Sequence, residues 1–273
     1  KFIAGESYGG IRGPKIARNL QTRQGVAVKG LILISPALDF SDVLGTGLTR
    51  FVASLPSMAA VARAKEKSET LTRADMADAE AYARGEFLTD LIKGQADAEA
   101  TRRLADRFAT LTGIDQAESR RLAGRFDVSE FRRAFDRDGG KVTGRYDASV
   151  RGFDPYPDSS ASDFNDPSEG PLLTSLTSAA FELHARKLNW RPTGSYELLS
   201  RTVNRKWDFG KNRSSVESMS DIRELLAADP QFRLLVAHGL FDLATPYFAS
   251  QIRLDQLPTF GSRDRVKFVV YPG

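Results

Sequence analysis

The stretch from Ala4 to Gly10, AGESYGG, constrains the fold of this chain more than any other part of the sequence. It follows the apolar residues FI and precedes a segment, Gly10 to Arg23, whose apolar residues recur with helical spacing. A second apolar run, Val28 to Ile34, comes next and ends at Ser-Pro. Strand, tight turn, helix and buried strand form a βαβ unit, which predicts a parallel sheet covered on both faces.

The same alternation returns near the end of the sequence. A strand, a turn, a helix and a last strand are expected at Phe232–Ala237, His238–Pro246, Tyr247–Leu257 and Val266–Tyr271. Residues 41 to about 225 are instead mostly helical in pattern, and we find no internal repeat. We therefore predict an α/β core made of residues 1–40 and 226–273, interrupted by a helical insertion, residues 41–225, that forms a cap.

Several segments of the insertion have recognisable helix signals. Thr72 and Asp75 resemble a capping box at a helix start, and Gly94 and Gly113 are placed to end helices. Three apolar stripes at helical spacing are expected to be buried helix faces: Met76, Ala79, Ala83, Phe87 and Leu91; Leu104, Phe108 and Leu111; Leu172, Leu176, Ala179, Ala180 and Leu183. Residues 139–171 are rich in Gly, Asp, Ser and Pro, which predicts a long loop or a pair of irregular strands.

Composition excludes several classes of site. The 273 residues include no Cys and two His, so disulfides and thiolate metal sites are excluded, and neither a metal nor a cofactor is expected. No run of about 18 apolar residues exists, which excludes a membrane span. Three Arg-Arg pairs lie beside acidic residues in helix-like segments, so we interpret them as solvated helix faces and expect no nucleic-acid partner: Arg102-Arg103, Arg120-Arg121 and Arg132-Arg133, near Asp106, Glu118 and Asp136.

The Gly-rich turn places a serine where a nucleophile is useful. A sharp strand-to-helix turn lifts the Ser7 hydroxyl clear of the sheet and brings the residues two before and two after it close together. Gly5 and Gly9 therefore both have a steric reason to be glycine. The backbone N–H of Tyr8, at the start of a helix, would point toward a developing oxyanion. The pattern G-x-S-x-G in this context predicts a nucleophile elbow, against the alternative of a plain Gly-rich turn.

A nucleophilic serine needs a base and an acid that orients it, and on this fold they follow in the order Ser, acid, His. Asp242, in the turn after the strand at Phe232–Ala237, is the expected acid. Two alternatives remain open: Asp39, after the strand that ends at Ile34, is a rival acid, and Asp242 could simply cap the helix that begins near Pro246.

Neither histidine of the sequence is well placed to be the base. His184 lies within a helix of the insertion, and His238 is four residues before Asp242 on the same strand end. The expected position follows the strand Val266–Tyr271, where the sequence stops at Pro272-Gly273. We therefore expect the chain to be a fragment that lacks the first part of its sheet and its catalytic His, and to be inactive alone.

These residues resemble the serine carboxypeptidase family. GESYGG, Gly5 to Gly10, is close to that family's signature, and the resemblance extends to the spacing of about 200 residues to the Gly-x-x-Asp turn at Gly239–Asp242 and to the ending VVYPG. The resemblance implies an α/β-hydrolase fold with a mostly parallel sheet and a helical cap. It also implies an exopeptidase that releases the C-terminal residue of a peptide through an acyl-enzyme on Ser7.

The resemblance further implies that Glu6 helps to bind the free C-terminal carboxylate of the peptide, paired with an acidic residue upstream of Lys1. The absence of cysteine suggests a bacterial-type member, for which a periplasmic or secreted location is favoured, while the oligomeric state is left open. Ser35-Pro36 departs from the Asn-Gly usual in the family and leaves the substrate preference open. An esterase or acyltransferase, or a catalytically inactive binding protein that retains the cap, is the alternative.

Overall fold

The computed structural model describes residues 1–67, 71–159, 166–191, 193–194, 196–209 and 216–272, so part of the predicted loop 139–171 and Gly273 lie outside the described residues. The chain forms an α/β structure around a four-stranded parallel sheet, as predicted. Its strands stand in the order β1, β2, β5 and β6, with the bounds Phe2–Glu6, Gly30–Ile34, Arg233–Gly239 and Val266–Tyr271. All three strand pairs are parallel, and Gly5, Leu33 and Val236 lie level with one another across the sheet.

Three helices pack beside the sheet: α1 (Gly9–Arg23), α10 (Met219–Ala228) and α11 (Tyr247–Leu254). Helices α1 and α10 bury the side of the sheet that carries Leu31, Leu33 and Val236. Because the strand order advances in one direction, right-handed crossovers place the connecting helices on one and the same face. The expectation that both faces are covered is therefore wrong for the described residues.

The other face of the sheet is open. Register places Phe2, Ile32, Ile34 and Tyr271 on it, and all four side chains are exposed. Strand β1 forms the edge of this sheet, with β2 as its neighbour on one side. An apolar face and an edge strand that remain in water favour association with other protein surfaces.

Helix α1 contains Pro14 in its second turn, where proline removes a backbone donor. The carbonyl that would have accepted this hydrogen bond belongs to Gly10, and the buried hydroxyl of Ser218 donates to it at 2.7 Å. Pro14 itself is buried against the sheet domain. The helix therefore continues through the proline because a residue distant in sequence satisfies the freed carbonyl.

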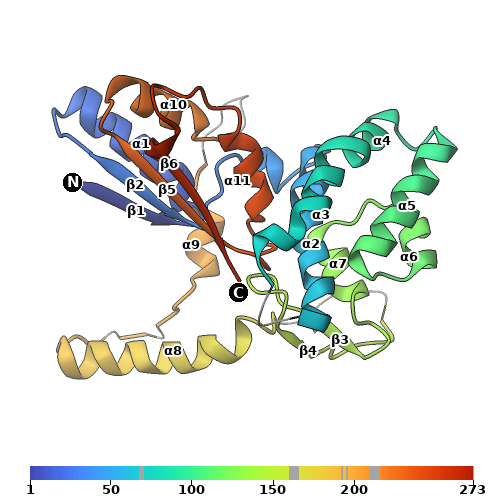
Figure 1. Ribbon diagram of the computed structural model, residues 1–273. Helices are drawn as coiled ribbons and strands as arrows, with labels where there is room; N and C mark the ends of the chain where they lie inside the picture. Colours follow the sequence, from blue (N-terminus) through green and yellow to red (C-terminus); the bar gives the residue numbers. More distant parts are fainter. Residues whose placement is uncertain (68–70, 160–165, 192, 195, 210–215, 273) are drawn as a thin grey trace.

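A helical lobe lies beside the sheet, to the right in Figure 1. It contains α2 (Thr49–Lys67), α3 (Ala77–Tyr82), a π-helical turn (Ala83–Phe87), α4 (Leu88–Lys93), α5 (Ala98–Thr112), α6 (Gln116–Arg121), α7 (Val128–Ala134) and a hairpin of β3 (Lys141–Thr143) and β4 (Arg151–Phe153). The capping box of Thr72 and Asp75 is confirmed, and Gly113 ends α5 in the left-handed conformation. The first two predicted apolar stripes are buried. One core joins most of their residues to Phe241 and Phe248 near the sheet, whereas Ala79 and Leu111 pack in a smaller cluster with Ala59.

The third predicted stripe does not become a buried face. Helix α8 (Gly170–Glu182), which continues as a π-helical turn (Leu183–Lys187), has no buried residue and lies apart from both the sheet and the lobe. Leu172, Leu176 and Leu183 are all exposed. A short helix, α9 (Arg201–Lys206), follows it and brings the chain back toward the sheet.

The chain rejoins the sheet domain earlier than the predicted boundary at residue 225. The Phe40 N–H donates to the Val216 carbonyl at 3.0 Å, and the Ser218 N–H donates to the Leu38 carbonyl at 2.9 Å. Helix α10 then packs on α1, so the predicted boundary falls within an element of the sheet domain. Within the described residues, no helix combines the length and the apolar character that crossing a membrane requires.

Candidate functional site

The turn at residues 5–10, called the Ser7 turn from here on, joins β1 to α1 with a strained backbone. Ser7 has φ of 53°, a left-handed conformation that is uncommon for a residue with a Cβ atom. A Cβ atom on Gly5 would lie 2.7 Å from the Gly9 carbonyl oxygen, so position 5 must be glycine. A Cβ atom on Gly9 would meet nothing within 4 Å, which corrects the expectation that both glycines are required.

Gly10 is the second glycine that the turn needs, and the sequence reasoning missed it. A Cβ atom there would lie 2.4 Å from the Pro36 side chain. The first turn of α1 is therefore in close contact with the segment that follows β2. The Ala37 N–H donates to the Ser7 carbonyl at 3.0 Å, which ties the same two segments together.

Two polar groups of the Ser7 turn are unpaired within the part of the chain that the structure describes. Among the described residues, the Ser7 hydroxyl has no hydrogen-bond partner and the Tyr8 N–H has no acceptor. Both residues are partly exposed, and Tyr8 directly precedes α1. An N–H donor at a helix N-terminus beside an accessible hydroxyl is the arrangement that stabilises negative charge on a reacting carbonyl oxygen.

Asp242 lies at the end of β5 in the turn formed by residues 239–246, called the Asp242 turn from here on. Its carboxyl group is buried and accepts hydrogen bonds from the N–H groups of Ala244 and Thr245, at 2.8 and 3.0 Å, and from the Thr245 hydroxyl at 2.8 Å. Burial raises the pKa of Asp242, while these donors and the Ser35 side chain act in the opposite direction. The N-cap of α11 is Pro246, so Asp242 does not cap that helix.

The carboxylate of Asp39, the rival acid, already has partners away from the Asp242 turn. Its carboxylate accepts a hydrogen bond from the Ser41 N–H at 2.9 Å and lies 3.2 Å from the Arg253 guanidinium. Arg253 also binds Asp42 through two hydrogen bonds of 2.7 Å. This network links a short 3-10 helix, Phe40–Asp42, to α11, so Asp39 belongs to a structural ion-pair network.

The turn after β2 separates the two candidate groups. Strand β2 lies between β1 and β5, so the backbones of β1 and β5 are about 10 Å apart. Ser35 has φ of 41° and donates its N–H to the Ala237 carbonyl, while its own carbonyl lies 2.9 Å from the Thr245 hydroxyl. The departure Ser35-Pro36 was the sequence signal for this turn.

Neither histidine lies between these groups. His238 is buried with its Nδ1 at 3.1 Å from the Thr245 carbonyl and its Nε2 at 2.9 Å from the Ser250 hydroxyl. Burial lowers the pKa of His238 to about 3. His184 is in the π-helical turn after α8, where its ring contacts Trp190 and Tyr196.

Aromatic side chains surround Tyr8. Its ring lies 5.9 Å from the rings of Phe40 and Trp207 and 5.3 Å from that of Phe209, and the Trp207 indole N–H donates to the Tyr8 hydroxyl at 3.2 Å. Trp207 and Phe209 remain partly exposed, and the Arg12 guanidinium lies over the Trp207 ring. Trp207 therefore lines an aromatic surface around Tyr8, the residue that follows Ser7.

Glu6 ends β1 immediately before Ser7. It stands opposite Ile34 in the sheet register and is exposed. Among the described residues it forms no hydrogen bond or ion pair. An exposed and unpaired carboxylate next to the candidate nucleophile is available to a ligand.

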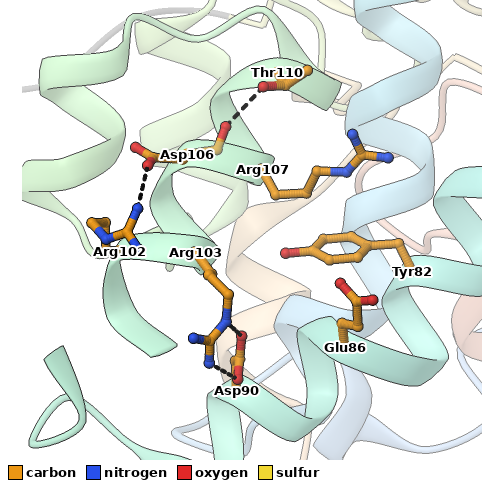
Figure 2. Close-up of a pocket in the computed structure, with 8 residues that line it drawn as sticks. All are labelled: Tyr82, Glu86, Asp90, Arg102, Arg103, Asp106, Arg107 and Thr110. Atoms are coloured by element: carbon orange, nitrogen blue, oxygen red, sulfur yellow. Dashed lines mark hydrogen bonds and ion pairs between the residues drawn. The ribbon is translucent and has the colours of Figure 1, made fainter. Parts of the chain in front are cut away.

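A cavity of about 360 Å³ lies in the helical lobe, and no residue of the Ser7 turn lines it (Figure 2). It is lined by Tyr82, Glu86, Asp90, Arg102, Arg103, Asp106, Arg107 and Thr110. Arg103 binds Asp90 through two hydrogen bonds, Arg102 pairs with Asp106, and the Arg107 guanidinium lies over the Tyr82 ring. Cations and carboxylates are equal in number along this cavity, so it presents no excess charge to a ligand.

The three Arg-Arg pairs have different environments. Arg102, Arg103, Arg120 and Arg121 form exposed ion pairs, as expected of solvated helix faces. Arg132 and Arg133 are buried instead, which corrects the interpretation for this pair. They bind Asp166 and Asp154 at 3.0 and 3.2 Å and hold the loop around β3 and β4 against α7.

No protein-family model matches the chain, and no curated protein sequence matches it at a significant level.

Proposed function

We propose that the chain carries the nucleophile and the acid of a serine hydrolase with an α/β-hydrolase fold, and that its reaction is that of a serine-type carboxypeptidase. The conformation of Ser7 is the observation that carries this proposal. A left-handed serine between a parallel strand and a helix, with Gly5 packed against the Gly9 backbone, is the geometry of a nucleophile elbow.

In the proposed reaction, Ser7 Oγ attacks the carbonyl carbon of the last peptide bond while a base takes the hydroxyl proton. The Tyr8 N–H and the N-terminus of α1 stabilise the oxyanion. The C–N bond then breaks, the protonated base gives its proton to the leaving amine, and water hydrolyses the acyl-enzyme on Ser7. Asp242 fixes the orientation of the base and stabilises its charged form.

The position of Glu6 supports the exopeptidase part of the proposal. The leaving residue of a peptide attacked at Ser7 carries a free carboxylate only if it is the last residue. Glu6 is an exposed side chain next to Ser7 and forms no hydrogen bond or ion pair among the described residues, so it is available to a ligand that carries such a carboxylate.

The test uses the protein expressed from its complete reading frame and a fluorophosphonate probe. We expect the probe to label Ser7, Ser7→Ala to abolish labelling, and Ser178→Ala, a substitution of an exposed serine on α8, to leave it intact. Labelling that survives Ser7→Ala would overturn the assignment of the nucleophile. No labelling at all would favour an inactive binding protein.

A matched set of substrates then tests the reaction class. Peptides with a free C-terminus should lose one residue at a time, and the same peptides with an amidated C-terminus should be cleaved much more slowly. Hydrolysis of simple esters with no cleavage of either peptide would favour the esterase or acyltransferase alternative.

A further inference from the structure

Thr245 links the Asp242 turn to two other parts of the sheet domain. Its N–H and its hydroxyl both contact the Asp242 carboxyl group, at 3.0 and 2.8 Å. The same hydroxyl lies 2.9 Å from the Ser35 carbonyl oxygen, and the Thr245 carbonyl is 3.1 Å from His238 Nδ1. One buried residue therefore touches the candidate acid, the strained turn after β2 and a buried histidine.

His238 fixes the backbone of Thr245. A carbonyl oxygen can only accept a hydrogen bond, so Nδ1 of His238 carries the proton. With its pKa lowered to about 3 by burial, His238 stays neutral at physiological pH, and its Nε2 accepts from the Ser250 hydroxyl. The hydrogen-bond chain from Ser250 through His238 to Thr245 is complete without any contact with Ser7.

The Thr245 hydroxyl has one proton and two acceptors. Asp242 Oδ2 and the Ser35 carbonyl compete for it, and the charged carboxylate is the stronger acceptor. When the carboxylate is neutralised, the Ser35 carbonyl remains available. The hydroxyl can therefore respond to the charge of Asp242 without leaving a buried polar group unsatisfied.

We propose that Thr245 is the positioning residue for Asp242, and that its hydroxyl keeps the Asp242 carboxylate charged and oriented toward the base. The inference rests on the proposed function, because Asp242 needs to be charged only if it supports a catalytic base. Neutral His238 holds Thr245 in place and takes no part in proton transfer.

The experiment compares Thr245→Val, which has nearly the same shape without the hydroxyl, with Thr245→Ser, which retains it. We expect kcat/KM of Thr245→Val on a Ser7-dependent substrate to fall about tenfold near pH 6. The acid limb of its pH profile should move upward by about one unit, because the charged carboxylate loses a donor. The kcat/KM of Thr245→Ser should stay within about threefold of the wild-type value, and the acid limb of its pH profile should not shift.

Tyr146 supplies a control from the helical lobe. Burial raises the pKa of Tyr146, and the carboxylates of Glu169 and Asp242 add to that shift. Tyr146 is therefore neutral throughout the acid limb, and Tyr146→Phe should leave the limb where it is. A shift in Tyr146→Phe as large as in Thr245→Val would assign the effect to the surroundings of Asp242 and overturn the role of the hydroxyl.

A titration of the Asp242 carboxyl group by ¹³C NMR, assigned with Asp242→Asn, gives a readout that does not depend on turnover. The pKa of Asp242 should be higher in Thr245→Val than in Thr245→Ser. The inference would be overturned if the pKa of Asp242 were equal in the two variants. It would also be overturned if Thr245→Val lost activity equally at every pH, or if Thr245→Ser lost as much activity as Thr245→Val. A wild type without Ser7-dependent activity would overturn the proposed function itself, which separates the two failures.

Discussion

The Ser7 turn and the Asp242 turn lie at the ends of two parallel strands and differ in almost every physical respect. The Ser7 turn has a strained backbone, a partly exposed hydroxyl and an N–H without an acceptor among the described residues. The Asp242 turn is buried, and its carboxyl group is surrounded by donors. The group proposed to react is therefore accessible and unpaired among the described residues, whereas the group proposed to support it is already held in place by hydrogen bonds.

The largest expected effect tests which carboxylate supports the base. Asp242→Asn should lower kcat by about four powers of ten, as loss of a triad acid does elsewhere. Asp39→Asn should change kcat by less than about tenfold, because Asp39 already binds Arg253 and the Ser41 N–H. Steady-state kinetics of the two variants on one ester substrate decide between them, and the reverse ranking would move the acid to the turn after β2.

The second prediction concerns the pH dependence of stability near the Asp242 turn. Since the folded-state pKa of His238 is about 3 and lies below the unfolded value, the unfolded chain binds a proton between about pH 6.5 and 3 that the native protein does not. His238 therefore makes its full contribution to stability above that window, and this contribution is lost as pH falls, by about 3 kcal/mol at pH 4. Urea unfolding from pH 7 to 4 should show a shallower decline for His238→Asn than for wild type. Parallel curves would show that His238 is not held neutral.

The third prediction concerns the close approach of residues 5 and 9 in the Ser7 turn. Gly5→Ala would place a Cβ atom 2.7 Å from the Gly9 carbonyl oxygen, whereas Gly9→Ala meets open space. We expect Gly5→Ala to lower the free energy of unfolding by about 1–3 kcal/mol and to abolish fluorophosphonate labelling. Gly9→Ala should change stability by less than about 0.5 kcal/mol and retain labelling. Equal losses in the two variants would mean that the turn does not close through the approach of residue 5 to residue 9.

The same contrast explains what the sequence could predict. The parallel strands, α1 and the sharp turn at Ser7 follow from local patterns, because apolar periodicity and glycine spacing are properties of neighbouring residues. The role of Thr245 depends on Ser35, 210 residues away in the sequence, and Ser218 satisfies the Gly10 carbonyl across 208 residues. Such partners are set by strand order and cannot be read from spacing.

The predictions of burial for α8 and of exposure for Arg132 and Arg133 were wrong, because a local sequence pattern does not determine which other segment packs on a helix face. The stripe on α8 has helical periodicity, and the helix forms, yet Leu172 and Leu176 face water. Arg132 and Arg133 look like the other Arg-Arg pairs in sequence, but their carboxylate partners come from a loop more than 20 residues later. Burial is a property of the assembled fold. Periodicity and charge pattern therefore identified these helices but not which of their side chains are buried.

The smallest expected effect concerns the ring of Tyr8, where the free Ser7 turn meets the rest of the molecule. The Trp207 indole donates to the Tyr8 hydroxyl and contacts its ring edge-on, and both groups are accessible to a ligand. A substrate with a large apolar side chain could bury that side chain against Trp207, so Trp207→Ala should raise KM for such substrates about tenfold. Because Trp207 contacts the ring of Tyr8 and has no part in the proposed proton transfers, kcat should change little. Trp190→Ala removes the same type of side chain from beside His184 and is the matched control. An equal rise of KM in both variants would mean that the aromatic surface around Tyr8 plays no specific part in binding the substrate.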